Sequence, residues 1–264
     1  MNRFGKLCSG ALVLGVCGHA SAVTTWTLTG TPSGVTVSAY ANTGNVAGGS
    51  SANHANNGAI QTIQPATLHS YSGGIGIRNA DACASGWKCD RGEGSTPEHS
   101  VDNQQRYDMA LLSFPDTVKL TAARLGWMSN DSDITVMAYV GAGAPTTASG
   151  VADTNFVGLT YSQLISKGWA AIGNYANVGT AAPVALNAAG IISSYWLIGA
   201  YNPLANPFGA VFNSSSYDYV KFTAVSGYVA SIPTPGSFAL VAFALIAMFG
   251  IINGWPPRRQ KNLE

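Results

Sequence analysis

Charged residues are scarce in this 264-residue chain. They make up 9% of it, against roughly 25% in ordinary soluble domains. Between residues 23 and 230 there are eight basic and eleven acidic side chains, a balance of −3. A mildly acidic stretch without a basic block has no electrostatic means of holding a nucleic-acid backbone, so we expect no nucleic-acid partner.

Catalytic motifs are missing as well. The chain has no His-Glu-x-x-His, no Gly-x-Ser-x-Gly elbow, no phosphate loop and no dinucleotide fingerprint. His54, His69 and His99 are scattered along the sequence and mark no nucleophile–base spacing. We therefore assign no catalytic residue and expect a protein that is not an enzyme; a secreted hydrolase is the least favoured alternative.

Cysteine is limited to four residues. Two of them lie near the N-terminus, and Cys83 and Cys89 form an even pair separated by five residues. In an exported protein such a pair predicts a disulfide, which would contribute about 2 to 3 kcal/mol. A zinc site is the alternative, but it needs four ligands and only His99 lies near in the sequence.

The N-terminus has the order of regions that is typical of a secretory signal peptide. Arg3 and Lys6 precede an apolar stretch at 11–16, and small residues follow up to Ala22. We predict a signal helix over residues 1–22, removed by signal peptidase between Ala22 and Val23. A lipoprotein signal at Cys17 and a short core helix are the alternatives.

The C-terminus predicts a membrane anchor. A proline-containing hinge at 231–236 precedes an apolar stretch at 237–255, which we expect to be a transmembrane helix. A basic segment at 256–264 follows and is expected to stay in the cytoplasm. The uncharged part at 238–252 alone is short, and Trp255 brings the helix to about 30 Å. A buried core helix is the alternative.

This C-terminus resembles the PEP-CTERM sorting signal of Gram-negative bacteria. The resemblance rests on Pro233-Thr234-Pro235, the apolar segment after it and Arg258-Arg259. The family's hinge usually carries glutamate where this chain has Thr234. The resemblance implies processing by an exosortase, an intermediate anchored in the inner membrane, and final residence at the cell surface or outside the cell.

The body of the chain also resembles exosortase-dependent surface proteins. The resemblance covers roughly residue 98 to the end. The segments that resemble the family are residues 98–103, 107–108, 111–114, 118–120, 125–127, 131–134, 195–201 and 218–221. It implies a protein displayed by polysaccharide-producing bacteria, and it brings no known active site.

Strand-forming segments dominate residues 23–230. β-branched and aromatic residues alternate with small polar ones, separated by Gly, Pro and Asn turns. The expected strands are 24–29, 35–40, 59–64, 68–77, 107–114, 118–127, 134–140, 169–174, 191–202 and 217–229. We predict that the three from 107 to 140 form a central meander, with a break at 115–117.

One short helix is expected among these strands. Thr160 and Gln163 have the spacing of a capping box, and Gly168 supplies a stop. Many strands with a single short helix predict an all-β domain, a two-layer β-sandwich of jelly-roll type. A β-barrel is the alternative.

Carboxylates at the ends of the expected strands suggest a calcium site. Asp102, Asp108, Asp131 and Asp133 fall at such positions, with amides beside them. Ca²⁺ takes six to eight oxygen ligands. The alternative is that these side chains accept hydrogen bonds from nearby backbone N–H groups in turns, in which case no cofactor is needed.

Three functions fit these observations. The first is a surface or biofilm-matrix protein whose β-domain is not catalytic. The second is a module that binds exopolysaccharide, in which an exposed tryptophan would stack on a sugar ring; its candidates are Trp87, Trp127, Trp169 and Trp196. The third is a secreted hydrolase.

Overall fold

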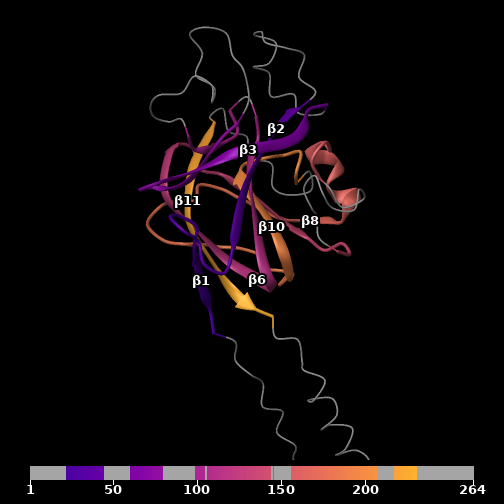
Figure 1. The fold of residues 1–264 in the computed structure, drawn as a ribbon. Coiled ribbons are helices and arrows are strands. Elements are labelled where there is room, and N and C mark those ends of the chain that lie inside the picture. The colour runs from indigo at the N-terminus through magenta and orange to yellow at the C-terminus, as the bar shows by residue number, and fades with distance from the viewer. Residues whose placement is uncertain are drawn as a thin grey trace, which may run out of the picture.

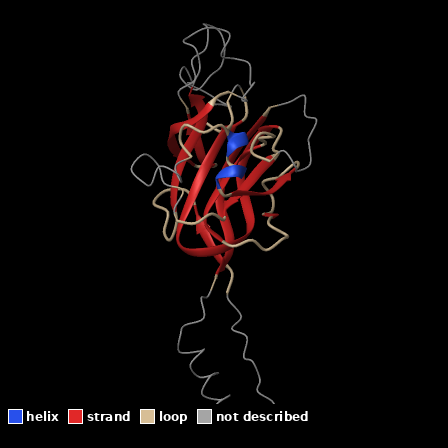
Figure 2. Ribbon diagram, turned by 90° about the vertical axis from the view of Figure 1, so that its right-hand side faces the viewer, coloured by secondary structure: helices blue, strands red, loops and turns tan. Residues whose placement is uncertain are grey.

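The fold was obtained as a computed structural model, which describes residues 22–44, 60–79, 99–104, 106–143, 145, 156–206 and 217–230. This part of the chain is mostly β-strand, as the sequence predicts, and its strands form one barrel-like sheet (Figures 1 and 2). The strands are β1 (Thr24–Thr27), β2 (Thr36–Gly44), β3 (Thr62–Tyr71), β4 (Gly74–Arg78), β5 (Val101–Asp102), β6 (Asp108–Asn130), β7 (Ile134–Tyr139), β8 (Trp169–Tyr175), β9 (Val184–Ala185), β10 (Ser193–Ala200) and β11 (Asp218–Val229).

The sheet order brings distant parts of the chain together. The strands follow the path β1-β11-β4-β3-β2-β6-β10-β7-β8, and the short strands β5 and β9 pair with β11 and β6. An additional pairing between β11 and β6 closes a ring through β4, β3 and β2. The first and last strands are neighbours, with Thr24 opposite Gly227. Both ends of the domain therefore leave from the same end of the barrel (Figure 1).

The long strand β6 makes this closure possible because it changes neighbours along its length. Up to Ser113 it pairs with β2 and β10, and from Val118 onward it pairs with β11. Its ladder with β10 skips from Ser113 to Val118. Pro115, which has no N–H to donate, lies in this irregular stretch and not in a ladder.

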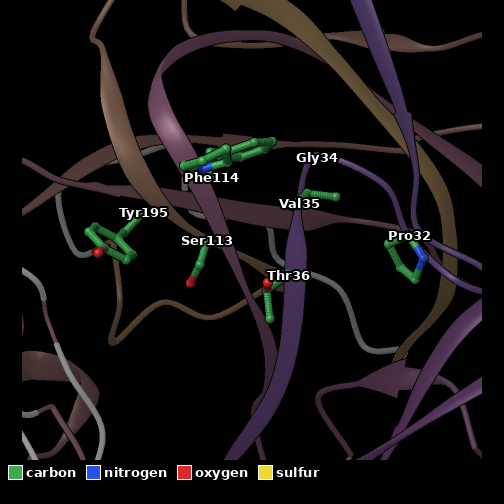
Figure 3. A pocket seen from close by; sticks show the side chains of 8 residues that line it. Pro32, Gly34, Val35, Thr36, Ser113, Phe114 and Tyr195 are labelled. Atoms are coloured by element: carbon green, nitrogen blue, oxygen red, sulfur yellow. The ribbon is translucent and has the colours of Figure 1, made fainter.

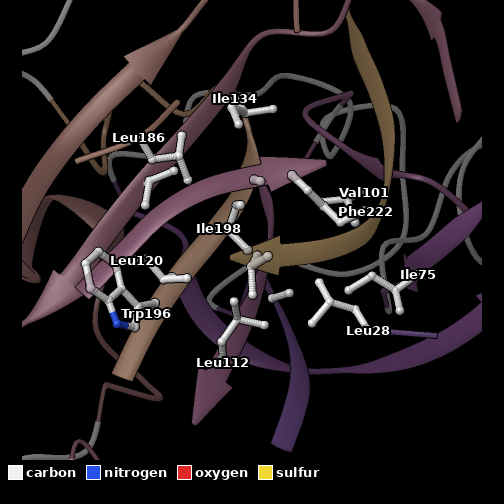
Figure 4. Close-up of a cluster of buried hydrophobic side chains, with 14 of the residues drawn as sticks. Leu28, Ile75, Val101, Leu112, Leu120, Ile134, Leu186, Trp196, Ile198 and Phe222 are labelled. Atoms are coloured by element: carbon white, nitrogen blue, oxygen red, sulfur yellow. The ribbon is translucent and has the colours of Figure 1, made fainter. Parts of the chain in front are cut away.

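Two apolar cores lie on opposite faces of the strands β2, β6, β10 and β7. One fills the inside of the ring and includes Leu112, Trp196, Ile198 and Phe222 (Figure 4). The other packs against the segment after residue 156 and includes Met109, Leu111, Met137, Phe156, Tyr161, Leu164, Trp169 and Leu197. Neighbouring residues along one strand thus enter different cores. Burial on both faces explains the continuous apolar runs at 109–112 in β6, 136–139 in β7 and 195–198 in β10.

The expected short helix consists of two consecutive 3₁₀ turns, η3 (Tyr161–Gln163) and η4 (Ile165–Lys167). The Thr160 N–H donates to the Gln163 Oε1 at 2.8 Å, which is the glutamine half of the capping box. Gly168 ends the segment with φ of 91°, a left-handed conformation that favours glycine. Tyr161 and Leu164 enter the second core, so packing holds these turns in place.

Three details of the predicted strand arrangement are wrong. β10 lies between β6 and β7, so the segments at 107–140 do not form a meander. No break occurs at 115–117, because β6 runs through it. β3 continues through Pro65 to Tyr71, and the hairpin turn falls after Tyr71. The first error concerns which segments pair and the other two concern where a strand ends, and both depend on partner strands that are far away in the sequence.

Several predicted features fall outside the described residues. They are most of the signal peptide, the hinge at Pro233-Thr234-Pro235, the apolar segment, Arg258 and Arg259, and the cysteines Cys83 and Cys89. These remain predictions. Within the described ranges, no helix has the length and apolar character needed to span a bilayer.

Candidate functional site

Among the described residues, a group of three carboxylates lies at the end of the barrel opposite the two chain ends. Asp131 and Asp133 belong to the connection between β6 and β7, and Asp218 is the first residue of β11. The β6–β11 ladder places Asp218 opposite Asn130, and a further bridge joins Asp131 to Asp218. One oxygen of each carboxylate lies within 4.8 Å of the others. We call these three residues the aspartate cluster.

Backbone and amide donors hold the buried members of the cluster. Asp218 Oδ1 accepts from the Asp133 N–H at 2.7 Å, and its Oδ2 accepts from the Asn103 Nδ2 at 2.6 Å. The Asn103 Oδ1 in turn accepts from the Asp218 N–H at 2.9 Å. Asp133 Oδ1 accepts from the Asn177 N–H at 2.7 Å. These bonds fix the carboxylates close together although their like charges repel.

Burial changes the proton affinity of the cluster. Asp218 and Asp133 are 0% and 3% exposed. Burial raises the pKa of Asp218 to about 7; the donated backbone hydrogen bond lowers it, and the charges of Asp133 and Asp131 raise it further. Burial also raises the pKa of Asp133, against the Asn177 hydrogen bond. Near neutral pH the cluster is therefore stabilised by a proton, and a bound cation would serve the same purpose.

Of the four predicted calcium ligands, the structure brings two together. Asp131 and Asp133 lie in the cluster. Asp102 accepts from the Gln104 N–H at 2.9 Å, and Asp108 accepts from the Asn79 Nδ2 at 3.1 Å. Asp102 thus accepts from a backbone N–H two residues away, as in the turn alternative, whereas the partner of Asp108 is a side-chain amide 29 residues away in the sequence.

Asp218 was missed as a candidate ligand. It lies 85 residues after Asp133 in the sequence, and only the antiparallel pairing of β11 with β6 brings the two together. Its position as an aspartate at the start of β11 is the one signal that could have found it.

The calcium hypothesis predicts a gain in thermal stability. If the aspartate cluster binds Ca²⁺, adding the ion to chelator-treated protein at about 100 times its Kd should stabilise the fold by about 2.7 kcal/mol. This corresponds to a rise in Tm of several degrees for a domain of this size, measured by differential scanning fluorimetry. Asp131→Asn should abolish the rise, whereas Asp116→Asn, at an exposed site on β6, should preserve it. If Ca²⁺ leaves the Tm of the chelator-treated wild-type chain unchanged, the calcium hypothesis is wrong.

A second buried polar group lies at the same end and is structural. Asn42 Nδ2 donates to Gln61 Oε1 at 3.0 Å, and Asn42 Oδ1 accepts from the Tyr107 N–H at 2.7 Å. The Tyr161 hydroxyl donates to the Tyr107 carbonyl at 2.9 Å. These bonds join β2, the start of β3, the entry of β6 and η3. Their partners are protein groups throughout, so they specify how these segments meet.

A surface hollow of about 430 Å³ lies at the other end of the barrel (Figure 3). Its lining is Pro32, Gly34, Val35, Thr36, Ser113, Phe114, Pro115 and Tyr195. The walls are apolar and proline-rich, with hydroxyls from Thr36, Ser113 and Tyr195. No carboxylate, imidazole, amine or thiol lines it, so this hollow offers no pair of groups for general acid–base catalysis.

Of the four tryptophans proposed for sugar stacking, three are described, and none of these three is an exposed platform. Trp169 and Trp196 are 2% and 0% exposed and belong to the two cores. Trp127 is half-buried, and the Lys221 Nζ lies 4.7 Å from its ring centre. Trp87 lies outside the described residues. Among the described tryptophans, sugar stacking therefore finds no support.

The two described histidines pack about a tyrosine ring. His69 and His99 lie about Tyr71, with ring centres 6.0 and 5.7 Å from the tyrosine ring. Lys221 lies 4.3 Å from the same tyrosine ring. This is a packed aromatic and cationic group on the side of the barrel. His54 lies outside the described residues.

Comparison of the chain with family models, with curated proteins and with solved structures gives no match.

Proposed function

We propose that this chain is an exported protein whose β-domain is displayed at the cell surface or in the extracellular matrix. Its first 22 residues would direct export and be removed by signal peptidase. Its last 34 residues would act as a sorting signal of the PEP-CTERM type, read by an exosortase from an intermediate in the inner membrane. The β-domain would have a binding or structural role and catalyse no reaction.

The observation that carries the proposal is the position of the two ends. Thr24 in β1 pairs with Gly227 in β11, so the chain enters and leaves the barrel at one end. Val23, at the predicted cleavage site, is 56% exposed and directly precedes β1. Cleavage there would leave the first strand intact. A domain whose ends share one side can be held by a tail without passing the chain over its opposite side.

The proposal extends to the finer architecture. We propose a jelly-roll-like sandwich in which β6 belongs to both layers, one with β2 and β10 and the other with β11. The change of partners near Ser113 and Val118 supports this description. The chain has few charged residues, so its solubility rests on amide and hydroxyl side chains. This composition is common in secreted matrix-like proteins and supports an extracellular setting.

The test is expression in a Gram-negative host that has an exosortase, followed by cell fractionation and intact-mass measurement. We expect protein outside the cytoplasm that begins at Val23 and lacks the tail after the hinge. Ala22→Arg should block removal of residues 1–22, because signal peptidase needs a small residue there. Ala22→Ser, which keeps a small side chain, is the matched control and should be processed. Cytoplasmic protein that retains residues 1–22 would contradict the proposed export.

A further inference from the structure

Exposed apolar side chains gather where the two ends of the barrel leave it. Of the six large apolar residues that are well exposed in the described part of the chain, four lie at this end: Val23, Val140, Ile192 and Val229, at 56, 54, 53 and 37% exposure. The other two, Ile60 and Tyr217, precede strands that begin at the opposite end. We call the end that carries these four residues the tether pole.

The strand pairings place these side chains in one row. Val229 pairs with Val118, which pairs with Ser193, the neighbour of Ile192. The Ser193 hydroxyl donates to the Tyr139 carbonyl at 2.6 Å, next to Val140. Adjacent strands are about 4.8 Å apart. The aliphatic groups from β1 to β7 therefore lie along one rim of the barrel.

Other features of the tether pole suit a boundary between water and lipid. Lys119 lies opposite Tyr228, and Lys167 directly precedes Gly168, whose carbonyl accepts from the Val140 N–H at 2.8 Å. The hollow with Tyr195 lies just inside the rim, because Tyr195 pairs with Ser113. One acidic side chain, the exposed Asp116 next to Thr117, also lies at this end. The aliphatic, tyrosine and lysine side chains around it are typical of surfaces that rest in the headgroup region.

The chain length after the barrel limits what can cover this surface. The Ala230 N–H donates to the Thr117 carbonyl at 2.8 Å, which fixes the start of the tail at the tether pole. Seven residues, 231–237, separate this point from the uncharged run at 238–252. Fully extended, seven residues reach at most about 25 Å. If the run spans a bilayer, the tether pole is held within about 25 Å of that bilayer, close enough for its side chains to reach the headgroups.

We infer that the tether pole is a lipid-contact surface, which seats the domain on the outer leaflet of the inner membrane while the tail is still attached. The inference rests on the proposed function, because it requires the apolar run to be in the membrane. The aspartate cluster, at the opposite end of β11, would then face away from the bilayer.

The test places a tryptophan probe at the tether pole of the full chain. Val140→Trp and Ile192→Trp are made separately, and Ile60→Trp, at a 67% exposed site on the opposite end, is the matched control. Each protein is reconstituted into vesicles of brominated phosphatidylcholine with phosphatidylglycerol. The emission of the wild-type chain is subtracted. We expect the added emission at 140 and 192 to be quenched at least about twofold more than at 60.

Flotation of the same vesicles distinguishes a failure of the lipid-contact surface from a failure of the membrane anchor. If the chain floats with the vesicles but positions 140 and 192 are quenched no more than position 60, the lipid-contact surface is wrong and the anchor stands. If the chain does not float, the membrane anchor is wrong and the inference falls with it. Hydrogen exchange of the unmodified chain at residues 139–143 gives a second measurement, with protection expected in vesicles, should a tryptophan variant fail to fold.

Discussion

Raising the pH from 5 to 8 is expected to lower the free energy of unfolding of this domain by about 2 to 3 kcal/mol. The cause is Asp218, whose pKa is raised by burial to about 7 from its ordinary value of 3.8. Between these two values the folded state holds a proton that the unfolded state has released. Stability therefore falls as the pH rises through this window, and the loss is complete about one unit above pH 7.

Asp133 acts in the same direction, because burial raises its pKa as well. The measurement is a series of urea denaturation curves from pH 5 to 8. Asp218→Asn should remove most of the slope, since the amide does not titrate. It should also lower stability at pH 5, because its Nδ2 cannot accept from the Asn103 Nδ2. The matched control, Asp116→Asn, changes an exposed carboxylate on β6 and should keep the slope. An equal slope in wild type and Asp218→Asn would refute this assignment.

Truncation of Trp196 is expected to lower the free energy of unfolding by about 3 to 5 kcal/mol. This residue is fully buried on β10, with its indole N–H donating to the Ser193 carbonyl at 3.0 Å. It packs among apolar residues of the ring, including Leu112 and Ile198. Trp196→Ala would leave a large cavity where these strands meet, and a close-packed interior relaxes only in part.

A matched change elsewhere in the chain isolates the effect of burial. Trp127 is half-buried on β6, and its main described partner is the Lys221 ammonium. Trp127→Ala should lower the free energy of unfolding by about 1 kcal/mol, the scale of a partly exposed cation–π contact. Urea denaturation of both variants at one pH makes the comparison. Equal losses in the two variants would contradict the placement of Trp196 in the core.

Local signals in the sequence predicted much of the fold. The strand segments around β1, β7, β8, β10 and β11 were found from residue type and alternation, and the capping residues located the 3₁₀ turns. These features depend on neighbours within a few residues, where propensity and turn chemistry act directly. The all-β class followed from them.

Long-range pairing was not predictable from the same signals. The apolar runs of β6, β7 and β10 have similar character, so nothing local says that β10 inserts between the other two. A proline such as Pro115 normally ends a strand, and its place inside β6 depends on β11 becoming the partner of β6 from Val118 onward. Asp218 was missed from the predicted ligands for the same reason, because it meets Asp133 only through the closed sheet.

The final strand also determines how the domain would respond to force. β11 runs from the aspartate cluster to the tether pole and pairs with β6 from Asp218 to Val229. Hydrogen bonds in an antiparallel ladder are perpendicular to the strands. A pull on the tail against a load at the far end would therefore shear the whole ladder at once, whereas a sideways pull would peel it bond by bond. If the tail anchors the domain, the β6–β11 ladder would therefore resist a pull along β11 more strongly than a pull across it.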